Sequence, residues 1–507
     1  MKPGKLIASV ATVALLATSV TPAFASGQSK GSKAKNVIFF VGDGMGVSTV
    51  SATRVFSVGV DGELVVDQMP FVALSRTSTT DHITPDSAGT MTSMMTGENT
   101  NSGVIGLDKS TERRDFNGDG DGRALVTVLE QAKSRGMRVG VVSTARVTHA
   151  TPAATYAHVN ERGLENDIAA QALPGNATYN ERLRGGLDLL MGGGRRFFCP
   201  SGETDEEGES CSRSDGRDLR QEFQDAGYTY VYNRAEFNLL GKRDLPVLGL
   251  FDRSHMDYEY DRPNDLAGEP SLSEMTGKAI DLLQRSRRDR NGFFLMVESG
   301  RIDHAHHASN AYRAMIETEE FDKAIATALR KVNLRDTLIV VTADHSHVFT
   351  MAGYPLRPLH DLPYSPVSAP ADYVDNNVDH SGILDVVYGI SASSGEISAA
   401  GDINAVPYTI LGYWNGGNPY DTGAPGTYRD KAAGRVDPRF DTHAGVAGSQ
   451  DPNYIQEVAV QTDSETHSAE EVAIYAAGPQ SWRFQGTVRN SKIAEVMRRA
   501  LRMGNPN

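Results

Sequence analysis

Short runs of aliphatic and aromatic residues, each bounded by polar residues or glycine, recur along most of the chain and predict buried β-strands. Longer segments with helical periodicity lie between these runs. The predicted strands are Asn36–Phe40, Arg138–Ser143, Pro246–Phe251, Phe293–Val297, Thr337–Thr342 and Val472–Ala476. The predicted helices include Ala124–Ser134, Leu272–Arg285, Ala311–Lys331 and Ser491–Arg502. This alternation predicts an α/β fold with a mostly parallel central sheet and helices on both faces.

The segment from Gly353 to Tyr454 interrupts the alternation. It is rich in Gly, Pro, Asn, Asp and Tyr and shows little helical periodicity, but it keeps apolar clusters such as Val386–Tyr388 and Tyr408–Trp414. Those clusters predict a large folded insertion rather than a disordered tail. We therefore expect residues 26–352 and 455–507 to form the two parts of one α/β core, with residues 353–454 inserted between them.

Residues 1–25 have the pattern of a secretory signal peptide. Two lysines precede an apolar run over residues 6–20, and Ala23-Phe24-Ala25 supplies the small residues that a signal peptidase reads. The apolar run is shorter than the roughly 20 residues that a membrane-spanning helix needs, and no later segment reaches that length. We expect cleavage after Ala25 and export to the periplasm or the extracellular medium, without a membrane anchor.

Composition and charge narrow the class of partner. The chain has 507 residues, of which 39% are hydrophobic and 22% charged, as in an ordinary globular protein. Its formal net charge of −14 disfavours binding to nucleic acid or to an acidic membrane. The two cysteines, Cys199 and Cys211, lie in a polar stretch and predict one disulfide across a surface loop in an oxidising compartment. A reactive thiol pair is the alternative, although no C-x-x-C spacing supports it.

Polar residues that follow the predicted strands are the first candidates for chemistry, because ligands of open α/β sheets bind beyond the carboxyl ends of the strands. Asp43, Glu298 and the pair Asp344-His345 each follow an aliphatic run. Any one of these carboxylates could instead cap a helix. Four potential metal ligands at three strand ends together favour a metal site.

A second group of potential ligands begins at Asp303. Asp303 and His307 are four residues apart, so on a helix both side chains lie on one face and can bind one cation. His306 has the other permitted spacing and is a competing ligand. A carboxylate with imidazoles suits zinc. The alternative is a solvated, polar start of a helix.

Ser87, in the segment Thr84 to Thr90, is a candidate nucleophile. A helix that begins near Ser87 would direct backbone N–H groups at the serine oxygen or at a bound phosphate. Taken alone, Ser87 reads more readily as a helix cap, since no G-x-S-x-G elbow surrounds it. Direct coordination to a metal ion would still activate this serine, because it lowers the pKa of the hydroxyl group.

Together these segments resemble the alkaline phosphatase family. Six blocks follow in the order of that family across nearly the whole chain: Val37–Gly46, Pro85–Thr90, Thr148–Ala153, Val297–His307, Val341–His347 and Glu465–His467. The resemblance implies an alkaline phosphatase-like fold with a crown-like insertion, which in the family lies near a dimer interface. It also implies hydrolysis of phosphate monoesters through a phosphoserine, with two zinc ions and one magnesium ion.

Carried over residue by residue, the resemblance implies three metal sites. The first zinc is assigned to Asp303, His307 and His467, the second zinc to Asp43, Asp344 and His345 beside Ser87, and magnesium to Asp43, Thr151 and Glu298. The hard oxygen ligands suit magnesium, and the sets with imidazole suit zinc. The resemblance also selects His307 over His306, and His467 over His360, His380 and His443, choices that spacing alone leaves open.

The resemblance further assigns phosphate binding to Arg162, whose planar guanidinium can bind two phosphate oxygens. Without it, Arg162 would read as an exposed arginine at the start of a helix. His149 and His304 are similar to the branch of the family that carries histidines near magnesium and phosphate, whereas another branch has Asp and Lys there. A further cation site near Phe251 and Asp252 also resembles a calcium region of the histidine branch, but the spacing nearby differs.

Two competing interpretations come from the same residues. The metal scaffold would also suit another phosphotransfer reaction or sulfate-ester hydrolysis, and an exported zinc or phosphate binding protein would explain the ligands without turnover.

The segment Asp115–Asp121 is similar to the start of a calcium loop, but Val126 stands where such a loop has Glu. We expect a solvated turn there.

Overall fold

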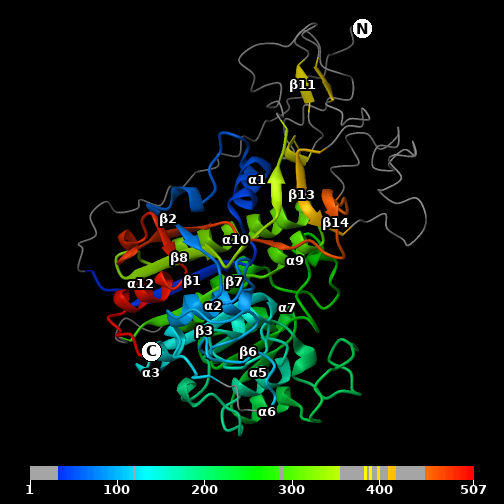
Figure 1. The fold of residues 1–507 in the computed structure, drawn as a ribbon. Coiled ribbons are helices and arrows are strands. Elements are labelled where there is room, and N and C mark those ends of the chain that lie inside the picture. The colour runs from blue at the N-terminus through cyan, green and yellow to red at the C-terminus, as the bar shows by residue number, and fades with distance from the viewer. Residues whose placement is uncertain are drawn as a thin grey trace, which may run out of the picture.

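The centre of the molecule is one ten-stranded sheet with the order β17-β2-β16-β8-β1-β7-β3-β4-β6-β5 (Figure 1). The computed structural model describes residues 32–117, 122–284, 291–353, 382–384, 388–390, 397–399, 409–417 and 452–507. Within this sheet β16 runs antiparallel to β2 and β8, and the other paired strands are parallel. In sheet order the strands are Thr487–Arg489, Phe71–Arg76, Val472–Ala477, Thr337–Ala343, Asn36–Gly42, Phe293–Ser299, Arg138–Arg146, Leu189–Gly193, Val247–Leu250 and Thr229–Val231.

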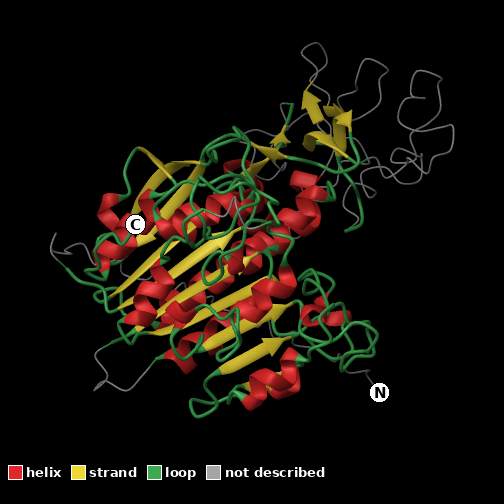
Figure 2. Cartoon of the chain, turned by 60° about the horizontal axis from the view of Figure 1, so that its bottom comes forward, coloured by secondary structure: helices red, strands yellow, loops and turns green. Residues whose placement is uncertain are grey.

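Helices cover both faces of the sheet (Figure 2), and the side chains of strand β1 pack on both. Val37, Phe39 and Val41 pack into a core with residues of α2, α3 and α12, whereas Ile38 and Phe40 pack into a second core with residues of α8 and α10. Successive strand side chains point to opposite faces, so the two cores lie on opposite sides of the sheet. The predicted α/β class, with a mostly parallel sheet between helices, is confirmed. The helices named here span Ser87–Thr96, Val128–Ser134, Lys492–Ala500, Leu272–Leu283 and Ala311–Lys331.

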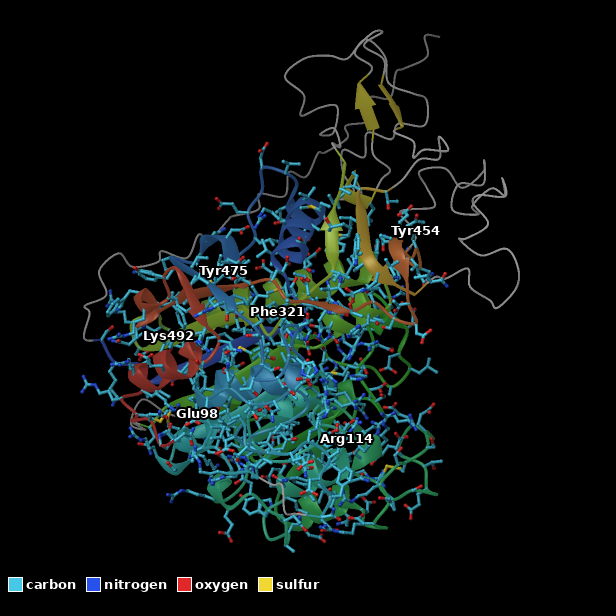
Figure 3. All side chains as sticks on the ribbon, viewed as in Figure 1. Glu98, Arg114, Phe321, Tyr454, Tyr475 and Lys492 are labelled. Carbon is cyan, nitrogen blue, oxygen red and sulfur yellow. A yellow bond between two sulfur atoms is a disulfide. The ribbon has the colours of Figure 1, made fainter. Side chains whose placement is uncertain are left out.

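The remaining elements connect these layers or cover their ends. The other α-helices in the described ranges are α1 (Val47–Val58), α4 (Ala150–Ala153), α5 (Glu165–Gln171), α6 (Leu219–Asp225), α7 (Arg234–Leu239) and α9 (Arg301–His307). Two short strands, β9 (Ser346–His347) and β15 (His467–Ser468), form an antiparallel pair. Phe321 of α10, labelled in Figure 3, packs edge-on against Phe40 of β1, which fixes the longest helix against the centre of the sheet.

All six predicted strands are present, and the predicted helix Ala311–Lys331 has the bounds of α10. The prediction that a helix begins at Ala124 is wrong, because α3 begins at Val128. Thr127 caps this helix: its hydroxyl accepts from the backbone N–H of Glu130, and the Glu130 carboxylate accepts from the N–H of Thr127. The cap is a local sequence signal that apolar periodicity alone does not detect.

Most of the predicted insertion, residues 353–454, lies outside the described residues, as does the predicted signal peptide, residues 1–25. One described strand from the insertion, β13 (Leu411–Gly416), pairs with β10 (Phe349–Met351) and β14 (Glu457–Gln461) in a separate three-stranded sheet. A two-stranded sheet joins β11 (Tyr388–Ile390) to β12 (Ile397–Ala399). Figure 1 shows β13 and β14 beyond one end of α10.

The cysteines form the predicted disulfide, Cys199–Cys211, and both are buried beneath a loop of mostly exposed polar residues. We also find that no helix in the described part of the chain combines the length and the apolar character of a membrane span.

Because Glu317 of α10 is buried, we expect the protein to lose stability as the pH rises. Its side chain accepts from the backbone N–H of Glu259, and burial raises its pKa from 4.5 to about 8. The folded protein therefore holds the proton of the Glu317 carboxyl group more tightly than the unfolded chain does, and the free energy of unfolding falls as the pH rises from 4.5 to 8. Glu317→Gln keeps the acceptor and removes the charge, so we expect it to be more stable than the wild type by on the order of a few kcal/mol at pH 9. Thermal melting against pH tests this, and an equal difference between the two proteins at pH 5 and pH 9 would contradict it.

Candidate active site

Three neighbouring strands bring the predicted carboxylates together. Strand β1 lies between β8 and β7, with Gly42 opposite Ala343 and Val41 opposite Glu298. Asp43 follows β1 and Asp344 follows β8, so this register places both next to Glu298 at the carboxyl edge of the sheet. All three carboxylates are buried. Asp344 Oδ1 accepts from the backbone N–H groups of Gly44 and His345, each at 3.0 Å.

The mutual approach of these carboxylates is unfavourable without compensating positive charge. Burial, and then the charge of Asp344, raises the pKa of Asp43 well above its ordinary value. Burial raises the pKa of Glu298 to about 8 and also raises that of Asp344. The buried atoms Glu298 Oε1 and Asp344 Oδ2 have no hydrogen-bond partner among the described residues. Buried carboxylates with free oxygen atoms suit divalent cations. The group formed by Asp43, Glu298 and Asp344 therefore fits a metal centre.

Helix α9 carries Asp303 and His307, and His467, the first residue of β15, lies beside them. Asp303 Oδ1 is 3.4 Å from His307 Nε2 and 3.3 Å from His467 Nε2, and the two Nε2 atoms are 3.1 Å apart. Asp303, His307, His467 and His347 form one group whose potential ligand atoms lie within 4.8 Å of one another. The structure thus brings together the three residues assigned by resemblance to the first zinc.

Backbone carbonyl groups fix the orientation of these two imidazoles. His307 Nδ1 lies 2.7 Å from the carbonyl oxygen of Glu465, and His467 Nδ1 lies 2.8 Å from that of Pro85. A carbonyl oxygen only accepts, so both Nδ1 atoms carry the proton and donate. With Nδ1 engaged in this way, each ring turns its Nε2 toward Asp303 Oδ1, so that two imidazole nitrogens and one carboxylate oxygen converge on one place. This is the arrangement expected of metal-binding histidines.

His347 was not among the predicted site residues, although it belongs to this group. Its Nε2 is 2.8 Å from Asp303 Oδ1 and its Nδ1 is 2.5 Å from Glu465 Oε2. Burial alone would lower the pKa of His347, but Glu465 and Asp303 raise it to about 9. Both ring nitrogens face carboxylate oxygens, a position from which His347 can hold Asp303 in place. Its spacing of two from His345 was visible in the sequence, but its partner Glu465 is remote in the chain.

Gly44 makes this arrangement possible. Its φ is +70°, and a Cβ atom there would lie 2.4 Å from His347 Nε2. Only glycine both adopts this backbone conformation readily and leaves room for the imidazole. The Gly44 that follows Asp43 is thus required by the close approach of the chain to the site.

Ser87 is the first residue of α2, and the interpretation of Ser87 as a helix cap is wrong. The N-cap is Asp86, whose Oδ1 accepts from the backbone N–H of Gly89 at 3.2 Å. Ser87 Oγ is 3.3 Å from Asp43 Oδ1 and 3.3 Å from His345 Nε2. The Ser87 hydroxyl therefore lies beside Asp43 and His345, which follow the ends of β1 and β8, and at the positive end of a ten-residue helix.

The Asp86 cap also holds Arg162. Arg162 Nη1 donates to Asp86 Oδ2 at 3.0 Å, and Nη2 lies 3.0 Å from His149 Nε2. Burial would raise the pKa of Asp86, but Arg162 and the N–H groups of Gly103 and Gly89 lower it. The guanidinium side chain is 24% exposed, so it is anchored beside the start of α2 while remaining accessible.

A third group of potential metal ligands lies around Glu298. Potential ligand atoms of Asp43, His149 and Glu298 lie within 4.8 Å of one another. The hydroxyl of Thr151, in α4, donates to Asp43 Oδ2 at 3.3 Å. Ser143, within β3, donates a hydrogen bond to Glu298 Oε2. Asp43, Thr151 and Glu298, which resemblance assigns to magnesium, are thus gathered, and Ser143 is an additional contact that sequence reasoning missed.

His304 and His149 lie beside one another, and His255 joins them. The ring centroids of His255 and His304 are 4.0 Å apart, and those of His149 and His304 are 5.7 Å apart. Burial lowers the pKa of His304 to about 3 and that of His149 well below its ordinary value. Burial therefore disfavours the charged form of both rings. His255 lies remote in the sequence from every predicted ligand, and nothing in its local pattern indicated this position.

The competing ligand His306 points elsewhere. Its Nε2 lies 2.9 Å from the Thr49 hydroxyl oxygen and its Nδ1 lies 2.8 Å from the Tyr413 hydroxyl oxygen, in a buried position. Both ring nitrogens are therefore engaged away from Asp303. The other competing histidines, His360, His380 and His443, lie outside the described residues.

The two weaker cation motifs do not form comparable groups. Asp115 accepts from the N–H of Asn117 in an exposed turn, and residues 118–121 lie outside the described chain. Burial, followed by Asp257, raises the pKa of Asp252. Within the described ranges, however, Asp252 belongs to no group of three carboxylate or imidazole side chains with ligand atoms within 4.8 Å.

Comparisons with known proteins agree with this geometry. Residues 34–503 match the family model described as alkaline phosphatase. The chain is 37% identical to the tissue-nonspecific alkaline phosphatase of Gallus gallus over 499 residues, covering 94% of this chain and 85% of that protein. It is 34% identical to an alkaline phosphatase of Gadus morhua, covering 93% of this chain and 92% of that protein.

Solved structures of bacterial alkaline phosphatases share the fold. The Thermus thermophilus enzyme superposes with a TM-score of 0.62 at 24% identity, covering 97% of this chain and 96% of that chain. The enzyme of the Antarctic bacterium TAB5 superposes with a TM-score of 0.59 at 24% identity, covering 93% of this chain and 99% of that chain.

Proposed function

This chain belongs to the alkaline phosphatase family and is a phosphomonoesterase, and we propose that it acts through a phosphoserine on Ser87 with two zinc ions and one magnesium ion. One observation carries the proposal most directly. The Ser87 hydroxyl, at the start of α2, lies 3.3 Å from both Asp43 Oδ1 and His345 Nε2. A serine among buried metal-ligand atoms, rather than beside a Ser-His-Asp relay, is suited to activation by cations.

The donor sets support the identities of the metals. Asp303, His307 and His467 would hold one zinc ion, and Asp43, Asp344 and His345 the second, because both sets combine carboxylate with imidazole. Asp43, Glu298 and Thr151 offer oxygen atoms and would hold magnesium, with His149 at its edge. When bound, such ions lower the pKa of coordinated hydroxyl groups and neutralise charge on a phosphoryl group.

The residues of the chain account for the two chemical steps. In the first, Ser87 Oγ attacks phosphorus, its bond to the phosphoryl group forms, and the bond to the departing alcohol breaks. The N-terminal backbone of α2 and the Arg162 guanidinium bind nonbridging oxygen atoms. In the second, water attacks the phosphoserine and releases inorganic phosphate, which restores the Ser87 hydroxyl. His149 contacts Arg162, and His304 lies beside His149, so both would border a phosphate that Arg162 binds.

Arg162→Ala should weaken phosphate binding and slow turnover without abolishing it. The metal ions carry most of the compensating charge, so the loss of one bidentate contact should reduce kcat/KM roughly 10- to 100-fold. Steady-state kinetics with an aryl phosphate, together with inhibition by inorganic phosphate, measures both effects.

Arg113→Ala is the matched control, because Arg113 also pairs with a carboxylate, Glu161, but lies outside the metal cluster. We expect the control to keep near wild-type values. An Arg162→Ala enzyme with unchanged phosphate inhibition would remove Arg162 from the phosphate site.

Parallel assays with aryl phosphate, bis-aryl phosphate and aryl sulfate test the assignment of substrate class. We expect the monoester to be hydrolysed fastest, the rate to be lost on chelation, and zinc with magnesium to restore it. Preference for the diester or the sulfate would favour the competing activities on the same metal scaffold. Metal binding without hydrolysis of any of the three would favour a binding protein.

We further propose that the protein is exported after cleavage at Ala25 to the periplasm or the extracellular medium. The Cys199–Cys211 disulfide supports this proposal, because such bonds persist in oxidising compartments. We also propose that residues 353–454 form a crown-like insertion in the core of residues 26–352 and 455–507, and that the enzyme is a homodimer. Light scattering of the purified enzyme tests the dimer.

A further inference from the structure

A groove of about 670 Å³ runs along one side of α12, the last helix of the chain. Its wall includes residues spaced three, four and seven positions apart, which therefore share one face of the helix: Ser491, Lys492, Glu495, Arg498 and Arg499. Arg489 of β17 lies at the end where α12 begins, and Lys492 is labelled there in Figure 3. The groove is thus elongated and has basic side chains near both ends of the helix.

The groove is positively charged on a protein whose formal net charge is −14. Four of its side chains are cationic and Glu495 is the only acidic residue among its lining residues. Glu495 already binds Lys492 at 2.8 Å and Arg499 at 2.7 Å. Its single charge cannot neutralise four cations, so the groove keeps an excess of positive charge.

Arg498 is the buried member of this set, with 4% of its surface exposed. It donates to the carbonyl oxygens of Thr96 and Val126 and to the side-chain oxygens of Gln131 and Asn505. These acceptors are neutral, and no carboxylate of the described residues forms an ion pair with Arg498. Burial lowers the pKa of Arg498 to about 10, and the charge of Glu98 offsets this only in part. An anion in the groove would add negative charge beside this buried guanidinium.

The other end of the groove has independent features that suit an anion. Ser491 is the N-cap of α12, and its hydroxyl makes no capping hydrogen bond to the helix. The positive end of this nine-residue helix therefore faces the groove together with Lys492 and Arg489. Arg76, the partner of Arg489 in the parallel β17–β2 register, adds positive charge nearby, although it does not line the groove itself.

We propose that this groove is a second anion site, which binds a compound carrying two phosphate groups separated by roughly 10 Å, the rise of seven helical residues. One phosphate binds at Arg489, Ser491 and Lys492, and the other at Arg498 and Arg499. The site lies apart from the catalytic centre. Gly97, which lines the groove, follows the last residue of α2, whereas Ser87 is the first, about 15 Å away along the helix axis.

The test uses the metal-loaded full-length enzyme and hexamethylene bisphosphonate, whose P–C bonds a phosphomonoesterase does not hydrolyse. Isothermal titration should resolve a binding event that Arg489→Ala/Lys492→Ala weakens about tenfold or more, as expected for two lost charge-assisted contacts. The matched control is Lys242→Ala/Arg243→Ala, which removes the same charge from an exposed loop elsewhere. This control should leave the event unchanged, and both double variants should keep wild-type hydrolysis.

A third variant separates the shape of the groove from its charge. A Cβ at Gly504, which lines the groove, would meet no atom within 4 Å, so Gly504→Trp can place a bulky side chain there without altering charge. We expect Gly504→Trp to abolish the binding of hexamethylene bisphosphonate and to leave hydrolysis intact. Methylphosphonate, with one phosphonate group, should bind at least tenfold more weakly. Equal binding by the two double variants, or unchanged binding by Gly504→Trp, would overturn the proposal.

Discussion

Ser87→Ala should reduce kcat for phosphate monoesters by a factor of about 10³ or more, as loss of a nucleophile does in other hydrolases. The Ser87 side chain supplies no carboxylate or imidazole ligand, and the groups around it come from strand ends that the substitution leaves in place. We therefore expect the variant to retain its zinc and magnesium. Steady-state kinetics and elemental analysis of the same preparation measure both quantities.

Ser93→Ala provides the control within the same helix. Ser93 is also buried in α2, but its hydroxyl contacts Asn99 and Asn490 rather than the cluster. It should lose some stability and keep its turnover. A Ser87→Ala enzyme that retains most of the wild-type kcat would eliminate Ser87 as the nucleophile.

Asp43→Asn should be as damaging as the loss of the serine, but for a different reason. Asp43 belongs to two of the three candidate metal groups, those with Asp344 and His345 and with His149 and Glu298. Removing its charge weakens both sites, so we expect both metal content and kcat to fall, the latter by a factor of about 10³. Elemental analysis after gel filtration and kinetics at saturating zinc and magnesium measure these losses.

Asp322→Asn is a suitable control for the removal of a buried carboxylate. Asp322 is also an almost buried aspartate, and it accepts from the backbone N–H groups of Val65 and Val66 rather than joining the cluster. Its variant should keep a full complement of metal. Normal metal content and normal kcat in Asp43→Asn would show that Asp43 does not hold the ions that drive the reaction.

Most of the fold could be predicted because buried parallel strands are short aliphatic runs that stand out against polar boundaries. Four strands of the central sheet were missed. β5 and β17 are half-exposed segments of three residues with too little pattern, β2 has only two buried positions, and β4 ends in glycines. The start of α3 was missed because the Thr127 capping box, and not periodicity, determines it.

For the site, the residues at strand ends could be selected from their positions alone, since parallel strands direct their carboxyl ends to one edge. His307 and His467 could not be separated from other histidines by spacing, and the resemblance made that choice. His347, Glu465, Ser143 and His255 were missed because their roles depend on contacts between distant segments. For example, the contact of His347 with Glu465 spans more than a hundred residues. Only the fold determines which of these side chains meet.

Acid-quenched peptide mass spectrometry during turnover of an aryl phosphate, before and after chelation, most directly tests whether bound cations activate Ser87. We expect phosphate on the peptide that contains Ser87 in the metal-loaded enzyme, its loss together with activity after chelation, and its return with zinc and magnesium. Turnover with phosphate on another residue, or undiminished labelling of Ser87 after the metals are removed, would contradict the mechanism.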